Sequence, residues 1–333
     1  MSCYLVTGSC GFIGAETALR LLREGHDVVG LDNLNDYYDV NLKQQRLGRL
    51  TCHENFRFFQ IDISNAEELE KVFNTHKPSR VIHLAAQAGV QYGLTNPGAY
   101  SQSNLLGFMN VIDISQRRNI DHFVYASSSS VYGQNSIFPF KEDMEIRTPM
   151  SLYAATKIAN ESIAYAYSAT HGLRCTGLRF FTVFGPWGRP DMAPMIFAKS
   201  LLNGKEISLY NNGDYVRDFT YIEDVVEAIS LVADHPKKSG SLLEYENDAG
   251  DAVPSQVFNV GGSNPIRVSV FLEELEKALG IVGKKVYLPS RIGDAPATHA
   301  DNSLIEKITG WTSKTDLKLG IRKFAEWLMS LES

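Results

Sequence analysis

Short apolar segments alternate with amphipathic segments along the first half of the chain. In chain order the apolar runs and the helical patterns between them occupy 3–8, 15–25, 27–33, 80–86, 107–119 and 122–128. Strands that alternate with helices at this spacing predict βαβ units, in which right-handed crossovers join parallel strands. We therefore predict an α/β fold built on a doubly wound parallel sheet of the Rossmann type.

The composition indicates a globular chain whose partners are small molecules. The 333 residues are 44% hydrophobic and 21% charged, with a formal net charge of −6. Nucleic acids and anionic membrane surfaces bind clustered Lys and Arg, so this acidic balance argues against both partners. Because no apolar run approaches the ~20 residues that a membrane helix requires, we expect a soluble protein.

The cysteines bear on the cellular compartment. Cys3, Cys10, Cys52 and Cys175 lie far apart without a CxxC pair, and the N-terminus enters a strand without a charged leader. We expect reduced thiols, a cytoplasmic location and no metal site.

The first predicted strand runs into a glycine-rich turn, TGSCGFIG, which we interpret as a dinucleotide-binding turn. Gly8, Gly11 and Gly14 permit a tight turn, a close approach of backbone to pyrophosphate and close helix–strand packing. Phe12 and Ile13 would begin a helix whose N-terminal amides and dipole favour phosphate. The spacing GxxGxxG is one residue wider in its first step than the common fingerprint, and a merely tight turn is the alternative.

An acid follows at the end of the second predicted strand, where it would bind the ribose hydroxyls of the cofactor. Asp32 would repel the additional phosphate of NADP, and neither Asn33 nor Leu34 supplies the cation that NADP needs. NAD is therefore the predicted cofactor. The alternative is that Asp32 only caps its loop.

Two further strand ends are expected to contact the cofactor. After the third strand, Asp62 and Ile63 would place a carboxylate and an apolar contact against the adenine. After the fourth strand, the small residues of LAAQAG would lie near the phosphates. The contacts predicted there are Leu84, Ala85 and Ala86.

A helical pattern near the middle of the chain carries candidate catalytic groups. Tyr153 and Lys157 are four residues apart, so they share one helix face. A phenol titrates near 10, so acting as a base at neutral pH requires roughly 4 kcal/mol of help for the phenolate. An ammonium about 4 Å away, at an effective dielectric of about 20, supplies about that much. The alternative is a surface helix with a chance Tyr–Lys pair.

Together these motifs resemble those of the extended short-chain dehydrogenases/reductases, within the nucleotide-sugar epimerase family. The resemblance covers nearly the whole chain and rests on TGSCGFIG, Asp32, the serine-rich SSSSVYG, YAATK and GDYVRDFTYIEDVV. It implies that Ser128 hydrogen-bonds the 4-oxygen of the sugar and passes its proton to Tyr153. It also implies that Lys157 binds the nicotinamide ribose and lowers the pKa of the Tyr153 phenol.

The resemblance implies two domains. A Rossmann domain that binds NAD would cover 1–180, with 219–261 rejoining it later in the chain. A smaller α/β domain that binds the nucleotide sugar would comprise 181–218 and 262–333.

The second half of the chain contributes to both domains. We expect 221–229 and 257–260 to return to the sheet. By resemblance, Arg217 and Arg291 would bind the diphosphate, because guanidinium geometry suits phosphate oxygens, and Asp294 would hold a ribose hydroxyl. Solvated surface positions are the alternative for both arginines.

Finer features resemble the family members that act on UDP-glucuronic acid. In those relatives a threonine and an arginine, here Thr182 and Arg189, lie near the sugar carboxylate, whereas the galactose branch usually has asparagine at the position of Thr182. Arg189 would neutralise that carboxylate in a partly dry pocket, where an unpaired charge is costly. Alternatively, Arg189 only fixes its Gly- and Pro-rich loop.

The serine run favours epimerisation over elimination. Ser129 and Ser130 would face the C5 and C6 end of the sugar, where family members that dehydrate or decarboxylate their substrates carry acids, as in TDEVYG and TSEVYG. Hydroxyls cannot readily replace a carboxyl group as acid or base, but they can donate hydrogen bonds to a carboxylate. We predict inversion of C4 in UDP-glucuronic acid to give UDP-galacturonic acid through a 4-keto intermediate.

Other functions share parts of this pattern. A UDP-glucose or UDP-N-acetylglucosamine 4-epimerase has the same catalytic set, and a UDP-glucuronate decarboxylase has all of it plus an acid. A non-catalytic NAD-sensing protein would keep the fold alone. The resemblance further implies a homodimer that pairs through the helices expected at 98–119 and 151–167.

Overall fold

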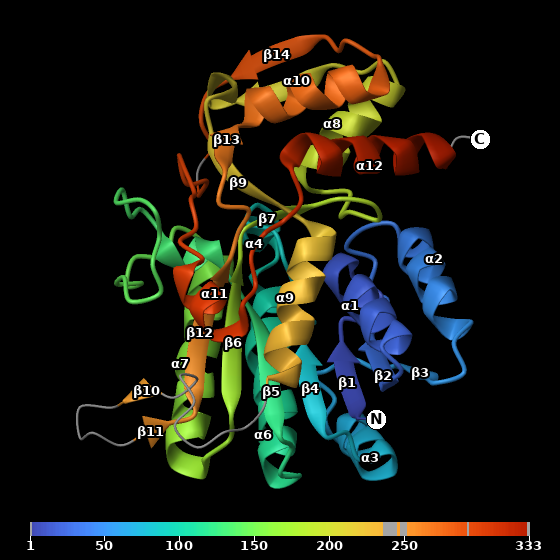
Figure 1. Cartoon of the computed structure of the whole chain (residues 1–333), viewed down its shortest axis with the longest axis vertical. Coiled ribbons are helices and arrows are strands. Elements are labelled where there is room, and N and C mark those ends of the chain that lie inside the picture. Colours follow the sequence, from blue (N-terminus) through green and yellow to red (C-terminus); the bar gives the residue numbers. More distant parts are fainter. Residues whose placement is uncertain (1, 236–244, 247–251, 292, 332–333) are drawn as a thin grey trace.

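Seven parallel strands form the central sheet, in the order β12-β6-β5-β4-β1-β2-β3 (Figure 1). This computed structural model describes residues 2–235, 245–246, 252–291 and 293–331. The strands of the sheet are β1 (Cys3–Thr7), β2 (Asp27–Asp32), β3 (Phe56–Gln60), β4 (Arg80–His83), β5 (His122–Ser128), β6 (Cys175–Phe180) and β12 (Ser255–Val260). From β1 the strand order proceeds through β2 and β3 to one edge of the sheet, and from β4 it proceeds through β5 and β6 toward the other edge. The order therefore reverses between β1 and β4, and ligands bind beyond the carboxyl ends of strands at such a switch point.

Both faces of the sheet are buried, which explains why its strands have continuous apolar runs. In β1, Tyr4 and Val6 pack into one hydrophobic core and Leu5 packs into the other. Successive side chains of a strand point to opposite faces, so a sheet covered on both sides needs apolar residues at every position.

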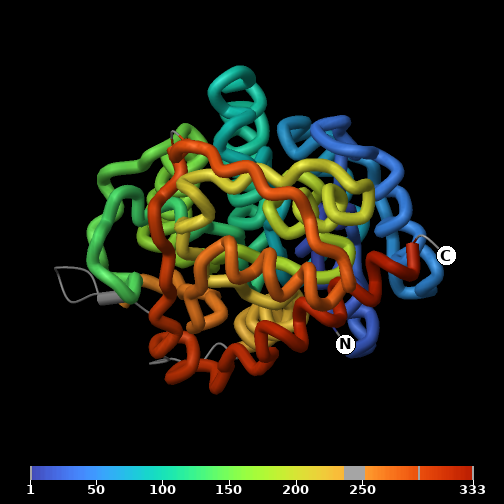
Figure 2. Tube along the Cα trace, turned by 90° about the horizontal axis from the view of Figure 1, so that it is seen from above, coloured from blue at the N-terminus to red at the C-terminus, as the bar shows by residue number. Residues whose placement is uncertain are grey.

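Helices cover the two faces of this sheet (Figures 1 and 2). On one face α1 and α9 pack together with α2 beside α1, and on the other face α6 packs between α3 and α7. Their bounds are α1 (Phe12–Arg23), α2 (Val40–Thr51), α3 (Ala66–His76), α6 (Phe108–Arg117), α7 (Leu152–His171) and α9 (Ile222–Asp234). The predicted doubly wound α/β fold is confirmed.

The segments expected to return to the sheet do so in different ways. Residues 257–260 lie in β12, which pairs in parallel with β6. Residues 221–229 lie mostly in α9, so their expected place in the sheet is wrong. From Ile222 onward the apolar residues recur at intervals of three and four, which is the period of a helix that covers a sheet. Residues 236–244 and 247–251 lie outside the described part of the chain.

A second group of elements packs beyond the carboxyl ends of the sheet strands (Figure 1). Strand β9 pairs in parallel with β7 and antiparallel with β13, and β14 pairs in parallel with β8. The elements are β7 (Thr182–Phe184), α8 (Ala193–Leu202), β8 (Ile207–Tyr210), β9 (Val216–Tyr221), β13 (Pro265–Arg267), α10 (Val268–Leu279), β14 (Lys285–Leu288) and α12 (Leu317–Ser330). These elements, which we call the roof, lie over the carboxyl ends of the sheet strands, where the predicted site residues are located.

Shorter elements complete the described chain. They are α4 (Tyr92–Thr95), α5 (Pro97–Tyr100), a π-helical turn (Ser101–Gly107), a 3₁₀ turn (Ser129–Tyr132), a second 3₁₀ turn (Asn211–Gly213), β10 (Tyr245–Glu246), β11 (Ala252–Val253) and α11 (Ser303–Thr309). The π-helical turn connects α5 to α6, so 97–117 run as one nearly continuous helical segment.

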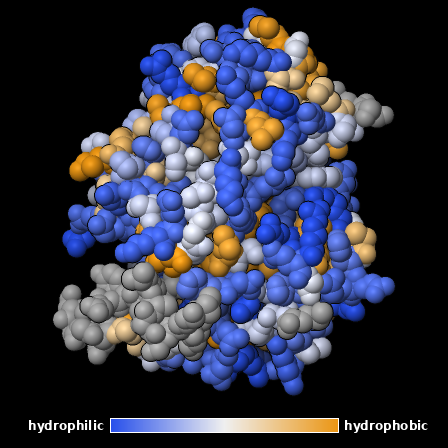
Figure 3. Space-filling model, viewed as in Figure 1, coloured by the Kyte–Doolittle hydropathy of each residue, from blue (hydrophilic) through white to orange (hydrophobic). Residues whose placement is uncertain are grey.

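The surface shown in Figure 3 is mostly hydrophilic, with apolar side chains scattered over it. Among the described helices, none combines the length and the apolarity needed to cross a bilayer. All four cysteines are free thiols.

Candidate active site

The turn between β1 and α1 has the close packing that a dinucleotide-binding turn requires. Gly8 has a φ of +70°, and a Cβ at Gly8 would lie 2.8 Å from the backbone nitrogen of Ala85. A Cβ at Gly14 would lie 2.0 Å from the Gly8 carbonyl oxygen. Helix α1 begins at Phe12 after its N-cap Gly11, and no side chain caps its first turn. The first amides of α1 therefore have no intrahelical acceptor, which fits the pyrophosphate of NAD.

Asp32 lies at the end of β2 and caps two backbone segments. Its Oδ2 accepts a hydrogen bond from the Cys10 amide (3.0 Å), and its Oδ1 accepts one from the Leu34 amide (2.9 Å). The loop-capping role is therefore present. A carboxylate has about four acceptor positions, so Asp32 retains capacity for ribose hydroxyls beside the glycine turn.

Asp62 lies beyond the end of β3 and is joined to the β2 loop. Asn33 donates from Nδ2 to Asp62 Oδ2 (2.8 Å), and the amide and hydroxyl of Ser64 both donate to Asp62 Oδ1. Burial raises the pKa of the Asp62 carboxyl, but these hydrogen bonds outweigh burial and hold the pKa below its ordinary value. Ile63 packs against Gly107, where a Cβ would lie 2.6 Å from its side chain.

The residues after β4 are tied to the end of β1. The amides of Leu84 and Ala85 donate to the carbonyl and the hydroxyl oxygen of Thr7, at 3.2 and 3.1 Å. The Thr7 hydroxyl is also hydrogen-bonded to His83 Nδ1, at 2.9 Å. Ala86 follows directly, so this small-residue segment lies beside the glycine turn.

Helix α2 brings a cation to Asp32 that local sequence did not indicate. Burial lowers the pKa of the Lys43 ammonium, and the negative charge of Asp32 opposes that shift. Lys43 Nζ is already engaged, because it donates to the carbonyl and side-chain oxygens of Asn35, each at 2.7 Å. The lysine therefore stabilises the β2 loop, and the role of Asp32 in disfavouring the phosphate of NADP stays a prediction.

The three predicted catalytic residues meet at the end of β5. Ser128 is the last residue of β5, and its hydroxyl hydrogen-bonds the phenol of Tyr153 in the first turn of α7. Lys157 Nζ lies 5.8 Å from the centroid of the Tyr153 ring and donates to the carbonyl oxygen of Ala126 (2.8 Å). Ser151 caps the N-terminus of α7 by accepting from the Ala154 amide, which fixes the start of this helix.

Burial controls the ionisation of the Tyr–Lys pair. It raises the pKa of the Tyr153 phenol, while the charge of Arg189 and the hydrogen bond from Ser128 lower this pKa by less. Burial also lowers the pKa of Lys157 to about 8, against the opposing charge of Glu161. Lys157 Nζ is directed at the Ala126 carbonyl, and the expected lowering of the phenol pKa by Lys157 stays a prediction.

The serines that follow one another along the strand end have different partners. Ser127 donates to the buried Glu161, which lies on α7 about two turns after Tyr153. Ser129 begins the 3₁₀ turn, and Ser130 donates to Ser128 Oγ from its amide (3.2 Å) and its hydroxyl (2.9 Å). Because both bonds from Ser130 end on the Ser128 oxygen, the Ser128 proton is free to point at Tyr153.

Arg189 lies close to Tyr153 and is also held by its own loop. Its Nε and Nη2 donate to the two oxygens of Asp191, at 3.1 and 2.5 Å. Tyr37 also donates to Asp191 (2.9 Å). Arg189 therefore both fixes its own loop, through Asp191, and lies close to the Tyr153 phenol. Thr182 starts β7, and no hydrogen bond within the described ranges joins it to Arg189.

The structure gathers Arg217, Arg291 and Asp294 in one neighbourhood. Burial raises the pKa of the Asp294 carboxyl, and the charges of both arginines oppose that rise. The Arg217 guanidinium lies 4.9 Å from the centroid of the Tyr215 ring, and that of Arg291 lies 3.7 Å from the centroid of the Tyr210 ring. Stacking on these rings holds two cations near the Asp294 carboxyl.

A family model agrees with this site. The model described as the NAD dependent epimerase/dehydratase family matches residues 4–261. The chain belongs to the NAD dependent epimerase/dehydratase family. The predicted cofactor, NAD, is thereby confirmed at the level of the family.

Members of this family and their solved structures match nearly the whole chain. UDP-glucuronate 4-epimerase 4 of Arabidopsis thaliana is 45% identical over 99% of this chain and 76% of its own length. The crystal structure of UDP-glucuronic acid 4-epimerase from Bacillus cereus with UDP-glucuronic acid and NAD has a TM-score of 0.90 at 29% identity and covers 99% of both chains. UDP-glucose 4-epimerase from Thermotoga maritima has a TM-score of 0.87 at 29% identity over 99% of this chain and 100% of its own.

Two residues of this epimerase/dehydratase site were missed in the sequence. Asp191 follows Arg189 by two residues, and an acid so close to an arginine in a turn was the available signal. Tyr37 lies 154 positions before Asp191, and no local pattern indicates that contact.

Proposed function

We propose that this protein inverts C4 of UDP-glucuronic acid to give UDP-galacturonic acid through a 4-keto intermediate. The observation that carries the proposal is the charge of Arg189 beside the phenol of Tyr153, at a strand end whose side chains are serines. A cation in this place suits a sugar that carries a carboxylate. The similarity to UDP-glucuronate 4-epimerases from a plant and from a bacterium supports the same substrate.

In the reaction, Tyr153 as phenolate takes the proton of the 4-hydroxyl, directly or through Ser128. When bound, NAD would supply a nicotinamide ring that can accept a hydride and, once reduced, donate it again, and in its oxidised form would add positive charge near the phenol. Ser130 orients Ser128 for the proton relay through its two hydrogen bonds. Lys157 would hold the nicotinamide ribose.

The carboxylate must be controlled, because the intermediate is a β-keto acid. Such an acid loses carbon dioxide when its carboxylate stands perpendicular to the carbonyl plane. We assign Thr182, Arg189, Ser129 and Ser130 to hold the carboxylate in another orientation. Hydroxyl and guanidinium donors bind the carboxylate without supplying an acid or base at C5.

Arg189→Ala should weaken UDP-glucuronic acid binding by about tenfold or more, and UDP-glucose binding by less than about threefold. The substitution removes the cation that faces the carboxylate and leaves the charge of Asp191 uncompensated beside it. Dissociation constants from isothermal titration calorimetry give both numbers.

Arg147→Ala is the matched control, because Arg147 also pairs with an acid two residues away, Glu145, but is exposed on the surface. Both dissociation constants should be unchanged in that variant. Equal weakening of the two sugars by Arg189→Ala would remove Arg189 from uronate recognition.

We propose that the roof anchors the UDP portion. Arg217 and Arg291 would bind the diphosphate and Asp294 a ribose hydroxyl, which keeps the nucleotide in place while the sugar turns over between the two hydride transfers. The proposed division into 1–180 with 219–261, and 181–218 with 262–333, follows from this role.

We further propose a homodimer in a cytoplasmic setting, where free thiols persist. Helices α6 and α7 lie side by side on one face, and their segment exposes Leu106, Met109 and Leu152 at 45%, 38% and 40%. Pairing these apolar residues with a second copy would remove them from water. Light scattering should give twice the chain mass of 37.0 kDa. A monomer at micromolar concentration would exclude this interface.

A further inference from the structure

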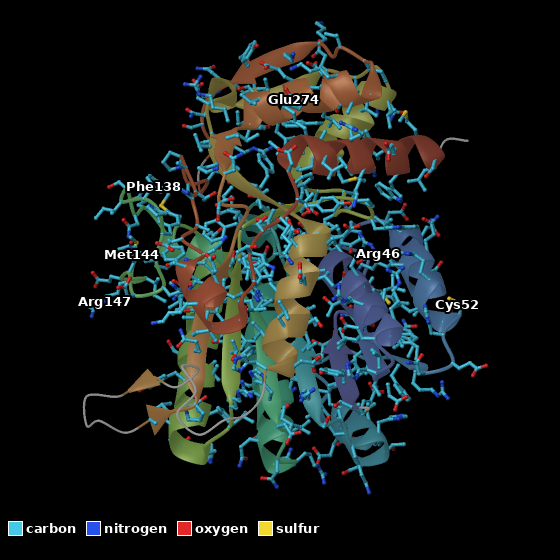
Figure 4. All side chains as sticks on the ribbon, viewed as in Figure 1. Arg46, Cys52, Phe138, Met144, Arg147 and Glu274 are labelled. Carbon is cyan, nitrogen blue, oxygen red and sulfur yellow. The ribbon has the colours of Figure 1, made fainter. Side chains whose placement is uncertain are left out.

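Arg46 is a buried cation without an acidic partner. It lies in α2, has no exposed surface, and is among the largest fully buried side chains of the described protein (Figure 4). Within the described ranges none of its hydrogen bonds ends on a carboxylate, and its Nε has no hydrogen-bond partner. A buried charge is costly, so the groups that compensate it indicate the purpose of this residue.

The partners of Arg46 come from two different parts of the site. Nη1 donates to the carbonyl oxygen of Cys10 (3.1 Å) and to the Tyr38 hydroxyl (2.7 Å). Nη2 donates to the carbonyl oxygens of Trp187 (2.6 Å) and Gly188 (3.1 Å). One planar guanidinium thus ties the glycine turn after β1 to the loop after β7.

The bonds to the second loop act directly on Arg189. The Gly188 carbonyl belongs to the peptide unit that joins Gly188 to Arg189. The hydrogen bond from Arg46 therefore fixes the orientation of the peptide plane that precedes the Arg189 Cα. Trp187 has a φ of +63°, a left-handed conformation that non-glycine residues rarely adopt without support. The two carbonyl bonds from Arg46 supply that support.

We infer that Arg46 is a positioning residue for uronate recognition: through the Trp187 and Gly188 carbonyls it holds Arg189 in place relative to the cofactor turn. The inference rests on the proposed function. The charge of Arg46 is compensated by four neutral acceptors, which two separate guanidinium nitrogens reach. A lysine cannot reach all four, because an ammonium carries its three donors on a single nitrogen.

The test compares Arg46→Lys with the matched control Arg49→Lys. Arg49 lies one turn later in α2, pairs with Glu16, and has its guanidinium 4.6 Å from the centroid of the Trp187 ring, so the control alters the same helix and the same loop neighbour. Calorimetric dissociation constants are measured for UDP-glucuronic acid and UDP-glucose, with the melting temperature of each variant.

For Arg46→Lys, binding of UDP-glucuronic acid should weaken about five- to tenfold while binding of UDP-glucose changes by less than about twofold. For Arg49→Lys both constants should stay within about twofold of the wild type. In an Arg189→Ala background, Arg46→Lys should cause no further loss of uronate affinity, because coupled residues are non-additive.

A purely structural role predicts something else: a lower melting temperature, equal weakening of both ligands and additivity with Arg189→Ala. That result would overturn the inference. If the wild type shows no preference for the uronate, the proposed function fails, and the inference fails with it. If the wild type has that preference and Arg46→Lys retains it, the inference alone fails.

Tyr38→Phe gives an independent reading that does not depend on how well Arg46→Lys folds. It removes one of the four acceptors of Arg46 and keeps the ring. The ratio of the two dissociation constants should shift in the same direction, by about two- to threefold. An unchanged ratio would contradict the inference.

Discussion

Tyr153→Phe is expected to lower kcat for UDP-glucuronic acid by a factor on the order of 10³ or more. The substitution removes the phenolic oxygen that accepts the 4-hydroxyl proton. Ser128 then has no base to which it can pass that proton. Since the ring and its packing stay, the dissociation constant of UDP-glucuronic acid should change by less than about threefold. Chromatographic assay of UDP-galacturonic acid formation and calorimetry measure the two quantities.

The matched control is Tyr167→Phe, which removes a hydroxyl from the same helix. Tyr167 donates to Asp113 of α6 at 3.3 Å and lies away from the strand end that carries Ser128. This variant should retain the wild-type kcat within about twofold. A Tyr153→Phe enzyme that kept more than about a tenth of the wild-type kcat would remove Tyr153 as the base.

Lys157→Met should lower kcat by a factor on the order of 10². The melting temperature should change only slightly. The substitution keeps the length and apolar stem of the side chain but removes the ammonium that the Ala126 carbonyl holds beside Tyr153. Without that charge the phenolate loses a nearby cation. Retention of the wild-type rate would restrict Lys157 to a structural role.

The same lysine sets an expected pH dependence in the wild type. Burial lowers the pKa of Lys157 to about 8, so its ammonium is present below that pH and is lost as the pH rises through it. Because this charge supports the phenolate, kcat should fall above about pH 8, and the fall should be absent from the residual activity of Lys157→Met. A wild-type rate that is level from pH 7 to about 10 would contradict this assignment.

Local patterns in the sequence carried most of the fold. The alternation of apolar runs with helical periods predicted the parallel sheet, because both signals depend on residues close together in the chain. The glycine turn and the Tyr153–Lys157 spacing were visible for the same reason. In 221–229 the three- and four-residue spacing of the apolar positions decides for helix α9, in place of the expected return to the sheet.

Contacts between segments far apart in the chain could not be predicted from local sequence patterns. Arg46 reaches carbonyl groups 141 and 142 positions away, and Tyr37 reaches Asp191 across 154 positions. Backbone carbonyls leave no sequence signal, so a buried arginine that binds them looks like any surface arginine. The desolvation that raises the pKa of the Tyr153 phenol also has no sequence signal, because it depends on the surroundings of the phenol in the folded protein.

The central claim is tested most directly by incubating the purified protein with UDP-glucuronic acid, without added cofactor, and following the products by proton NMR. UDP-glucose in a parallel tube provides the comparison. The account predicts UDP-galacturonic acid with no UDP-xylose, supported by NAD that stays bound through purification. Accumulation of UDP-xylose, or conversion of UDP-glucose alone, would contradict it.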